Sequence, residues 1–310
     1  MTIKELLIEG SKRLSRSSIR SSSKDLDCEV LLGFVLGISR EKLLGDFFWE
    51  VPGEDAVLYF RYVDEVAGGK PVAYVTHSRE FYGLDFYVDE RVLIPRPETE
   101  GVVEEVLGFL KKKDALTHGL SRPDWCRGVD ALVLDVGTGS LCITCAILKN
   151  FENAFAYAVD ISEDALEVAR VNSGYHGLET HCQIFQSDLL SNVEEGKFDV
   201  IVANLPYVRD EAGETSGGLL SEGVKKFEPG SALFGGGDGL ELYKKLIQEI
   251  IEKKVEFDLL VCEFGFGQVA LVAELLSKNF DQEKFKWEIK KDLAGIPRIF
   301  VVRSARADLG

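Results

Sequence analysis

Three stripes of apolar residues at helical spacing occupy residues 1 to 78. Their members are Ile3, Leu6 and Leu7, then Leu26, Val30, Leu31, Phe34 and Val35, then Val57, Phe60 and Val63. Recurrence at every third or fourth position is typical of one face of an amphipathic helix. A Ser-rich stretch at 15–23 separates the first two stripes, and Gly68-Gly69 suits a left-handed cap after the third. The pattern predicts a small helical bundle over residues 1–78.

The pattern changes to alternation after this bundle. Apolar and polar residues alternate over 84–88 and again over 92–94, with the acidic pair Asp89-Glu90 between the two runs. Because alternation on both sides of a polar turn is typical of a β-hairpin, we expect residues 79–95 to form a hairpin linker. A helix then begins near Thr99, and we interpret the polar segment 111–128 as a loop within or after it.

Strand-like and helix-like segments alternate from residue 131 onward. Strands are expected at 131–136, 155–159, 181–185, 198–203, 259–262 and 299–302, and helices at 141–149, 162–173, 240–252 and 268–276. This order predicts an α/β domain at 96–310, with a mainly parallel sheet that helices cover on both faces. Ligands bind such sheets at the carboxyl ends of the strands.

The overall charge limits the partners. The 310 residues carry 52 acidic and 36 basic side chains, which gives a formal charge of −16. Because nucleic-acid binding depends on contacts from Lys and Arg to phosphates, this balance argues against nucleic acid as the direct substrate. Apolar runs fall short of the roughly 20 residues of a membrane span, and residues 1–20 lack the apolar core of a signal peptide. We therefore expect a cytoplasmic protein with no membrane association.

The cysteines and histidines do not predict a metal site. Cys142 and Cys145 form a C-x-x-C pair, but a second pair and a suitably placed histidine are missing from the sequence. We interpret the two as small buried side chains on one face of a helix. The four histidines are spaced without the regularity of metal ligands.

A glycine-rich turn follows the first buried strand of the α/β domain. The segment 132–140 reads Leu-Val-Leu-Asp-Val-Gly-Thr-Gly-Ser. Glycine lets the backbone bend tightly and approach a ligand, and the helix after the turn offers its N-terminal amides. The turn is therefore a candidate cofactor site, whose residues are Gly137, Thr138, Gly139, Ser140 and Leu141.

Acidic residues end successive strands around this turn. Asp135 lies at the end of the first strand, and Asp160 ends the second, where it can accept hydrogen bonds from two ribose hydroxyls. Asp188, followed by Leu189, comes after the third strand and can meet an adenine amino group. A glycine turn with such acids fits a dinucleotide or S-adenosylmethionine. Three acids around Asp-x-Gly-x-Gly resemble the class I methyltransferases, which implies a Rossmann-like fold and S-adenosylmethionine, with S-adenosylhomocysteine as product. In that resemblance, Leu141 stands where a third glycine is usual.

The segment Asn204-Leu-Pro-Tyr207 follows another buried strand and suits methylation of a planar nitrogen. An amide nitrogen is a poor nucleophile because its lone pair is delocalised into the carbonyl. A site that methylates it must hold both N–H groups: the Asn204 side-chain oxygen can accept one, and the Leu205 carbonyl the other. Pro206 fixes the backbone, and the Tyr207 ring can stack on the flat group. Catalysis then rests mainly on positioning, and Asn204 also borders the expected cofactor.

These motifs resemble the HemK (PrmC) family of peptide chain release factor glutamine methyltransferases. Further segments carry the resemblance along nearly the whole chain: Pro71-Val-Ala-Tyr74, Glu80-Phe-Tyr-Gly-Leu84, Val92-Leu-Ile-Pro-Arg-Pro-Glu-Thr-Glu100, Glu228-Pro-x-x-Ala232, Gly235-Gly-Gly-Asp-Gly-Leu240, Glu263-x-Gly-x-Gly-Gln268 and Asp292-Leu-Ala-Gly295. The resemblance implies methylation of the glutamine in the Gly-Gly-Gln loop of release factors, during translation termination, with the N-terminal bundle helping to dock that partner. The family usually has Asn-Pro-Pro-Tyr, so Leu205 is a departure. We expect a monomer.

Two alternatives remain open at this point. Asn-Leu-Pro-Tyr itself resembles the motif of ribosomal RNA adenine N6-dimethyltransferases, which methylate an exocyclic amine flipped into a similar pocket. The charge of −16 and the Pro-Arg-Pro-Glu-Thr-Glu run argue against that alternative. The other is a methyltransferase-like fold that binds without catalysing, for which Leu141 and Leu205 are the supporting features. The intact Asp160, Asn204 and Tyr207 argue against it.

Overall fold

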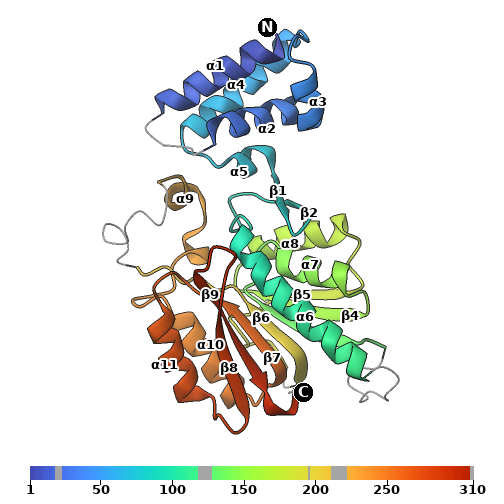
Figure 1. The fold of residues 1–310 in the computed structure, drawn as a ribbon, viewed down its shortest axis with the longest axis vertical. Helices are drawn as coiled ribbons and strands as arrows, with labels where there is room; N and C mark the ends of the chain where they lie inside the picture. The colour runs from blue at the N-terminus through green and yellow to red at the C-terminus, as the bar shows by residue number, and fades with distance from the viewer. Residues whose placement is uncertain (18–22, 118–127, 195, 211–221, 308–310) are drawn as a thin grey trace. The chain divides into compact units, whose positions relative to one another are not determined.

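The computed structural model describes residues 1–17, 23–117, 128–194, 196–210 and 222–307 (Figure 1). They fall into two compact units. The first comprises 1–78, 88–90 and 218–228, and the second comprises 79–87, 91–217 and 229–310, in each case as far as these residues are described. The division into 1–78, 79–95 and 96–310 that the sequence suggests stays a prediction.

The first unit is helical. Its helices are α1 (Ile3–Arg16), α2 (Lys24–Leu36), α3 (Arg40–Gly45), α4 (Gly53–Ala67), α5 (Val72–Thr76) and α9 (Glu222–Phe227). A capping box begins α1, because Thr2 Oγ1 accepts the Glu5 N–H and Glu5 Oε2 accepts the Thr2 N–H. Gly37 ends α2 in the left-handed conformation, with φ of 62°. The largest buried side chains of this core include Ile3, Leu6, Leu31, Leu32, Leu43 and Tyr59.

The buried helix faces differ in part from the predicted stripes. Val30 and Phe34 of α2 are each more than a third exposed, whereas Cys28 and Leu32 of the same helix are buried. Since α2 is apolar on several sides, its periodicity does not identify the face that packs. Val57, in the third stripe, is also mostly exposed.

The β-hairpin lies earlier in the chain than predicted. It pairs β1 (Ser78–Phe81) with β2 (Leu84–Tyr87), and its turn consists of Tyr82 and Gly83, with φ of 54° and 73°. Positive φ at both central residues is typical of the tight type I′ turn. Val92 and Ile94 are buried in the loop before the short helix η1 (Pro97–Thr99) and form no strand. Their alternation therefore reflects burial in a loop.

A seven-stranded sheet forms the centre of the second unit, in the order β5-β4-β3-β6-β7-β9-β8. The strands are β3 (Ala131–Val136), β4 (Ala154–Asp160), β5 (Cys182–Gln186), β6 (Lys197–Ala203), β7 (Glu256–Glu263), β8 (Phe285–Lys291) and β9 (Pro297–Ser304). The pairings among β3 to β7 are parallel, and β9 runs antiparallel to both β7 and β8. The mainly parallel sheet agrees with the prediction, whereas the edge strand β8 was not predicted.

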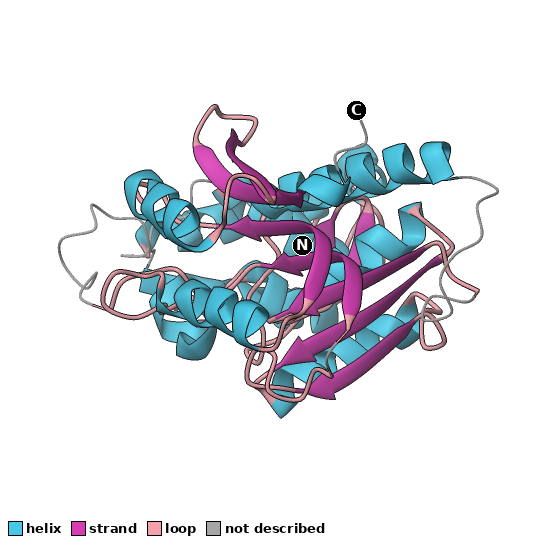
Figure 2. Cartoon of the chain, turned by 90° about the horizontal axis from the view of Figure 1, so that it is seen from below, coloured by secondary structure: helices cyan, strands magenta, loops and turns pink. Residues whose placement is uncertain are grey.

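Helices cover both faces of this sheet (Figures 1 and 2). On one face, α10 (Glu241–Glu252) and α11 (Val269–Asn279) contribute to a core that includes Leu246, Ile247 and Leu276. The other face is covered by α6 (Glu100–Thr117), α7 (Cys142–Asn150) and α8 (Glu163–Tyr175). Two short 3₁₀ helices, η3 (Gly230–Ala232) and η4 (Ala305–Ala307), complete the described elements.

Helix α6 extends into the polar segment 111–128, for which the sequence predicts a loop. Residues 111–117 of that segment are helical, and 118–127 lie outside the described residues. Lys113 explains why the helix continues: its Nζ contacts the carboxylates of Asp199 on β6 and Asp258 on β7, which are both buried. A buried charge needs a partner of opposite sign, so this ion pair joins the end of α6 to the sheet.

Candidate active site

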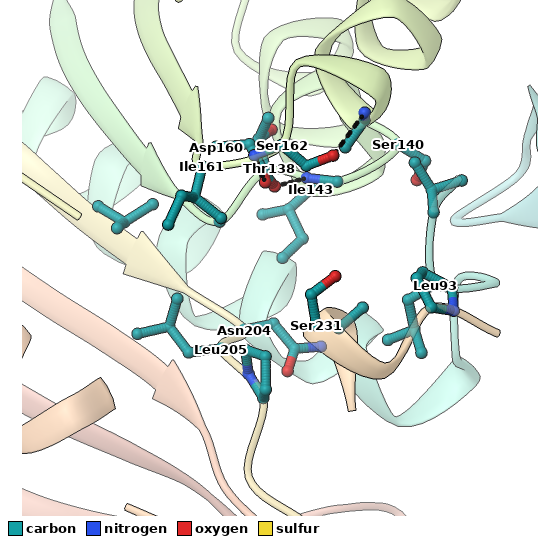
Figure 3. A pocket seen from close by; sticks show the side chains of 18 of the residues that line it. Leu93, Thr138, Ser140, Ile143, Asp160, Ile161, Ser162, Asn204, Leu205 and Ser231 are labelled. Atoms are coloured by element: carbon teal, nitrogen blue, oxygen red, sulfur yellow. Dashed lines mark hydrogen bonds between the residues drawn. The ribbon is translucent and has the colours of Figure 1, made fainter. Parts of the chain in front are cut away.

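A pocket in the second unit opens at the carboxyl ends of β3, β4 and β6 (Figure 3). The strand register brings these ends together, because Val136 pairs with Val159 of β4 and with Ala203 of β6. In Figure 3, Thr138, Asp160 and Ser162 lie on one side of the pocket, and Asn204 and Leu205 lie on the opposite side. Most predicted site residues line it: Gly137, Thr138, Gly139, Ser140, Asp160, Asp188, Leu189, Asn204, Leu205 and Pro206.

The glycine turn is held by hydrogen bonds from neighbouring strand ends. The N–H groups of Gly137 and Thr138 donate to Val159 O at 2.8 and 2.9 Å. Both glycines have positive φ, 75° at Gly137 and 53° at Gly139, a conformation that other residues adopt at a cost. A Cβ at Gly139 would meet no atom within 4 Å. The backbone is therefore open to a ligand at Gly139, as expected for a turn that a cofactor approaches.

Asp135 supports this turn from inside the protein. Its Oδ2 accepts hydrogen bonds from Thr138 Oγ1 at 2.8 Å and from Thr144 Oγ1 at 2.7 Å. Burial raises the pKa of Asp135 to about 6, although both threonine hydroxyls act in the opposite direction. Asp135 thus orders the turn and does not line the pocket.

Asp160 ends β4 at the pocket and can bind a diol. Its Oδ2 accepts the Gly139 N–H at 3.0 Å, and its Oδ1 accepts the Ser162 N–H at 2.9 Å. Burial raises the pKa of Asp160, and these N–H groups oppose the shift. Each carboxylate oxygen has more than one acceptor position, so the oriented carboxylate can still accept from two adjacent hydroxyls. This is the chemistry that a ribose ring requires.

Asp188 and Leu189 also line the pocket, in the loop after β5. Asp188 is about half exposed, and its Oδ2 accepts from Lys245 Nζ of α10 at 2.7 Å. Leu189 is buried with φ of 48°. The acid therefore lies where a polar group of a ligand can reach it, with an apolar side chain beside it.

Leu141 does not meet the expectation that its amide would face the ligand. It lies outside the pocket lining, is fully buried and has φ of 70° at the start of α7. Its N–H donates to Thr138 O at 2.9 Å. The amide is therefore used inside the turn. Cys142 and Cys145, on the helix that follows, are buried free thiols, as interpreted from the sequence.

Asn204 and Leu205 of the predicted catalytic turn line the pocket. Asn204 Nδ2 donates to Thr99 Oγ1 at 3.1 Å and to Glu263 Oε2 at 3.3 Å, so its Oδ1 is turned away from that carboxylate. Leu205 O lies 3.3 Å from the Tyr243 hydroxyl, whose closer acceptor is Glu263 O. Because a hydroxyl has one proton, Leu205 O keeps its acceptor capacity.

Tyr207 does not line the pocket, in contrast to the stacking role expected of it. Its hydroxyl donates to Glu263 Oε1 at 2.9 Å, and burial raises its pKa well above the usual value. Its carbonyl accepts from Gln268 Nε2 at 2.9 Å. In this structure Tyr207 therefore ties the turn to the end of β7.

A glycine-rich loop packs against the other side of the turn. The Gly235 N–H donates to Val208 O at 2.8 Å, and Val208 N–H donates to Leu233 O at 2.9 Å. A Cβ at Gly235 would lie 2.2 Å from Pro206 O, and one at Gly239 would lie 2.3 Å from Tyr207 O. Glycine is thus required at both positions by close backbone packing.

Thr99 and Glu263 are functional candidates that the sequence pattern alone did not single out. Both belong to segments that resemble family motifs, but their contacts with Asn204 arise only in the folded sheet. Arg96, Ser231 and Ala232 also line the pocket. Within the described residues, no group of acidic, His and Cys side chains could hold a metal ion. No described helix is long and apolar enough to cross a membrane.

Two family models match parts of this chain, and curated proteins are similar to it over nearly its whole length. Residues 5–76 match the PrmC N-terminal domain family, and residues 123–255 match the Methyltransferase small domain family. A release factor glutamine methyltransferase of Koribacter versatilis is 36% identical over 304 residues, which cover 98% of this chain and 99% of that protein. One of Bacillus subtilis is 35% identical over 295 residues, which cover 94% and 96%.

Solved structures show the same fold. The hMettl16 catalytic domain superposes with a TM-score of 0.52 at 16% identity, over 74% of this chain and 79% of that one. Together with the Methyltransferase small domain match, this confirms the predicted class I methyltransferase fold. The full-length similarity at 32% identity or more also confirms the resemblance seen in the sequence. This chain is a methyltransferase and belongs to the release factor glutamine methyltransferase family.

Proposed function

We propose that this enzyme transfers a methyl group from S-adenosylmethionine to the side-chain amide nitrogen of the glutamine in the Gly-Gly-Gln loop of a peptide chain release factor. One observation carries the proposal: Asn204 and Leu205, whose side-chain and main-chain oxygens can each accept an amide N–H, line the same pocket as Asp160 and the glycine turn. The names of the similar proteins support the same reaction.

The cofactor would be held by the turn and the acids around it. Gly137, Gly139 and their neighbours offer the backbone surface, Asp160 the ribose acceptors, and Asp188 with Leu189 the polar and apolar contacts for adenine. Bound there, S-adenosylmethionine would supply an electrophilic methyl group and leave as S-adenosylhomocysteine, while the acceptor nitrogen would release one proton to solvent. Leu141 is not part of this proposed set, because its amide is engaged within the turn.

The chain's own contribution to the reaction is to orient the acceptor amide. Asn204 Oδ1 would accept one N–H and Leu205 O the other, which fixes the plane of the amide and the direction of its nitrogen lone pair. Fixed donors and acceptors that need not reorganise lower the barrier most effectively. A leucine at 205 supplies the same carbonyl as proline would. Tyr207 would act through the turn rather than by stacking on the substrate, because its ring lies outside the pocket lining.

The release factor would contact more than the pocket. We infer that the N-terminal helices contribute to docking, since residues 5–76 match the PrmC N-terminal domain. The loop after α3 exposes Phe48 and Trp49, and exposed aromatic side chains are common at protein interfaces. One chain would suffice for the chemistry, because the pocket is built from residues between 91 and 242. Because the proposed substrate acts in translation, we infer that the enzyme acts in the cytoplasm.

A radiolabelled methyl-transfer assay tests the proposal. It would offer an intact release factor, the same factor with the Gly-Gly-Gln glutamine replaced, and ribosomal RNA in parallel. We expect label on the intact factor alone.

Label on the RNA would favour an adenine methyltransferase and would contradict the proposal. Label on both factor variants would mean that another residue is methylated. Cofactor binding with no label on any acceptor would favour a non-catalytic binding protein.

A further inference from the structure

Glu263 is a fully buried carboxylate at the end of β7. It is 1% exposed, and three side chains donate hydrogen bonds to it. Thr99 Oγ1 donates to Oε2 at 2.6 Å, Tyr207 OH donates to Oε1 at 2.9 Å, and Asn204 Nδ2 approaches Oε2 at 3.3 Å. A buried carboxylate without such donors would be costly, so the arrangement is that of an ionised group whose acceptors are occupied.

The chemistry of these partners leaves one arrangement for the Asn204 amide. An ionised carboxylate only accepts hydrogen bonds, so Asn204 must present its NH₂ group to Glu263. The Thr99 hydroxyl has a single proton, which goes to Glu263, so its oxygen can only accept from Asn204 Nδ2, at 3.1 Å. Neither Glu263 nor Thr99 therefore has a proton to donate to Asn204 Oδ1, so the flipped amide, in which Oδ1 would face them, is disfavoured.

We propose that Glu263, acting directly and through Thr99, is the positioning residue that keeps Asn204 Oδ1 directed at the acceptor amide. This inference rests on the proposed function, because it concerns the orientation of the group that would hold the substrate nitrogen. Glu263 itself does not line the pocket, so it acts through Asn204. The same carboxylate binds Tyr207, and it therefore holds both ends of the Asn204–Tyr207 turn.

Protonation of Glu263 would remove the preference for one orientation of the Asn204 amide, because a protonated carboxyl group can donate a hydrogen bond to Asn204 Oδ1. Burial raises the pKa of Glu263, and the negative charge of Glu98 raises it further. The hydrogen bonds from Thr99 and Tyr207 and the positive charge of Arg298 act in the opposite direction. The ionisable and charged groups around it are Tyr207 after β6, Tyr243 on α10, Cys262 on β7, Arg298 on β9, and Arg96 and Glu98 before and within η1. The turnover number should therefore fall when the pH drops through the pKa of Glu263.

Substitutions that alter hydrogen bonding with little change in shape test the proposal. Glutamine has one acceptor oxygen where glutamate has two, so it cannot accept hydrogen bonds at both the Asn204 and the Tyr207 positions. Glu263→Gln should therefore lower kcat about tenfold to hundredfold, the loss typical when a group that orients a site residue is removed. The KM for the release factor and the affinity for S-adenosylhomocysteine should stay close to wild type, and the acid limb of the kcat profile should disappear. Thr99→Val should lower kcat in the same way, and Thr99→Ser, which keeps the hydroxyl, should retain more of the wild-type kcat than Thr99→Val. Glu256→Gln, at the opposite, exposed end of β7, is the matched control.

Exchanging the carboxylate of Glu263 and the amide of Asn204 between the two positions gives the most direct test, by comparing kcat of the single and double variants. Asn204→Asp alone places a second carboxylate against Glu263 and should be nearly inactive. Combined with Glu263→Gln, the new amide can donate to the aspartate, whose other oxygen then faces the substrate, so kcat should rise above that of Asn204→Asp. Such recovery is a non-additive effect between contacting residues.

Three outcomes would overturn the inference: wild-type kcat in Glu263→Gln, equal losses in Thr99→Val and Thr99→Ser, or parallel losses of kcat and S-adenosylhomocysteine binding in folded Glu263→Gln. Absence of any glutamine methylation by the wild-type enzyme would instead contradict the proposed function.

Discussion

Replacing Gly235 by alanine tests whether backbone packing holds the catalytic turn in place. Gly235 lies in the loop that follows η3, and its N–H donates to Val208 O at 2.8 Å. An alanine Cβ there would lie 2.2 Å from Pro206 O and 2.8 Å from Gly239 O. Both are backbone atoms, so a rotation about a side-chain bond cannot relieve the contact.

The required displacement sets the size of the effect. Real Cβ contacts are essentially never shorter than 3.0 Å, so the Gly235 loop and Pro206 O must move apart by about 0.8 Å. Leu205 O and Asn204 belong to the same short turn, and they would move with it. Misplacement of reacting groups by about 1 Å costs on the order of 100-fold in rate, which corresponds to about 2.7 kcal/mol of transition-state stabilisation. Overpacking should also lower the free energy of unfolding by about 1–3 kcal/mol.

Gly237→Ala is the matched control. It changes the same loop, but its Cβ would meet only Glu241 Oε1, at the ordinary contact distance of 3.4 Å. The assay measures kcat and KM for methyl transfer to a release factor, with circular dichroism and thermal unfolding to verify the fold. We expect a large loss of kcat in Gly235→Ala and near wild-type kcat in Gly237→Ala. Similar kcat values for the two folded variants would refute the claim that this packing positions the turn.

Three further predictions concern single side chains. Asn204→Ala should lower kcat by about 100-fold to 1000-fold by removing the orienting acceptor, while calorimetry finds S-adenosylhomocysteine affinity largely intact; weaker cofactor binding with unimpaired chemistry would contradict this role. Lys113→Met should lower the free energy of unfolding by about 1–3 kcal/mol, because it removes the cation that Asp199 and Asp258 share while Asp258 keeps its ion pair with Lys197 at 3.2 Å. Urea unfolding should find little change in the exposed control Lys111→Met. Asp135 keeps its proton up to a pKa of about 6 in the folded protein but only to 3.8 when unfolded, so its contribution to stability falls as pH rises through this window, by up to about 3 kcal/mol. Asp135→Asn should therefore gain stability relative to wild type between pH 4 and pH 6, and parallel pH profiles of unfolding for the two proteins would disprove the shift.

Local signals explain what the sequence predicted well. The strand at 131–136 combines an apolar run with Gly137 and Gly139 directly after it, so its end and the turn are both visible in consecutive residues. Strand β8 lies at the edge of the sheet and lacks such an apolar run, and its own signal, the alternation of Phe285, Trp287 and Ile289 with charged residues, was missed. The hairpin was misplaced because its turn needs positive φ at Tyr82, a conformation that tyrosine does not indicate.

The candidate site was predictable only where its residues follow the strands directly. Asp160 and Asn204 come immediately at or after strand ends, so the sheet brings them to one edge. The contact between Thr99 and Glu263 joins residues 164 positions apart, and periodicity carries no information on such pairs. The inward direction of the Leu141 amide likewise depends on φ of 70°.

The pairing of β3 with β6 has a consequence for how this enzyme tolerates sequence change. The glycine turn follows β3 and the Asn204–Tyr207 turn follows β6. These two strands are adjacent and pair in parallel from Val133–Val200 to Val136–Ala203. Adjacent strands lie about 4.8 Å apart, a spacing set by main-chain hydrogen bonds rather than by side chains. Under the proposed function, the separation between the methyl donor and its acceptor is thus set by the peptide backbone, so the strand interiors can exchange one apolar residue for another while the reaction geometry stays constant.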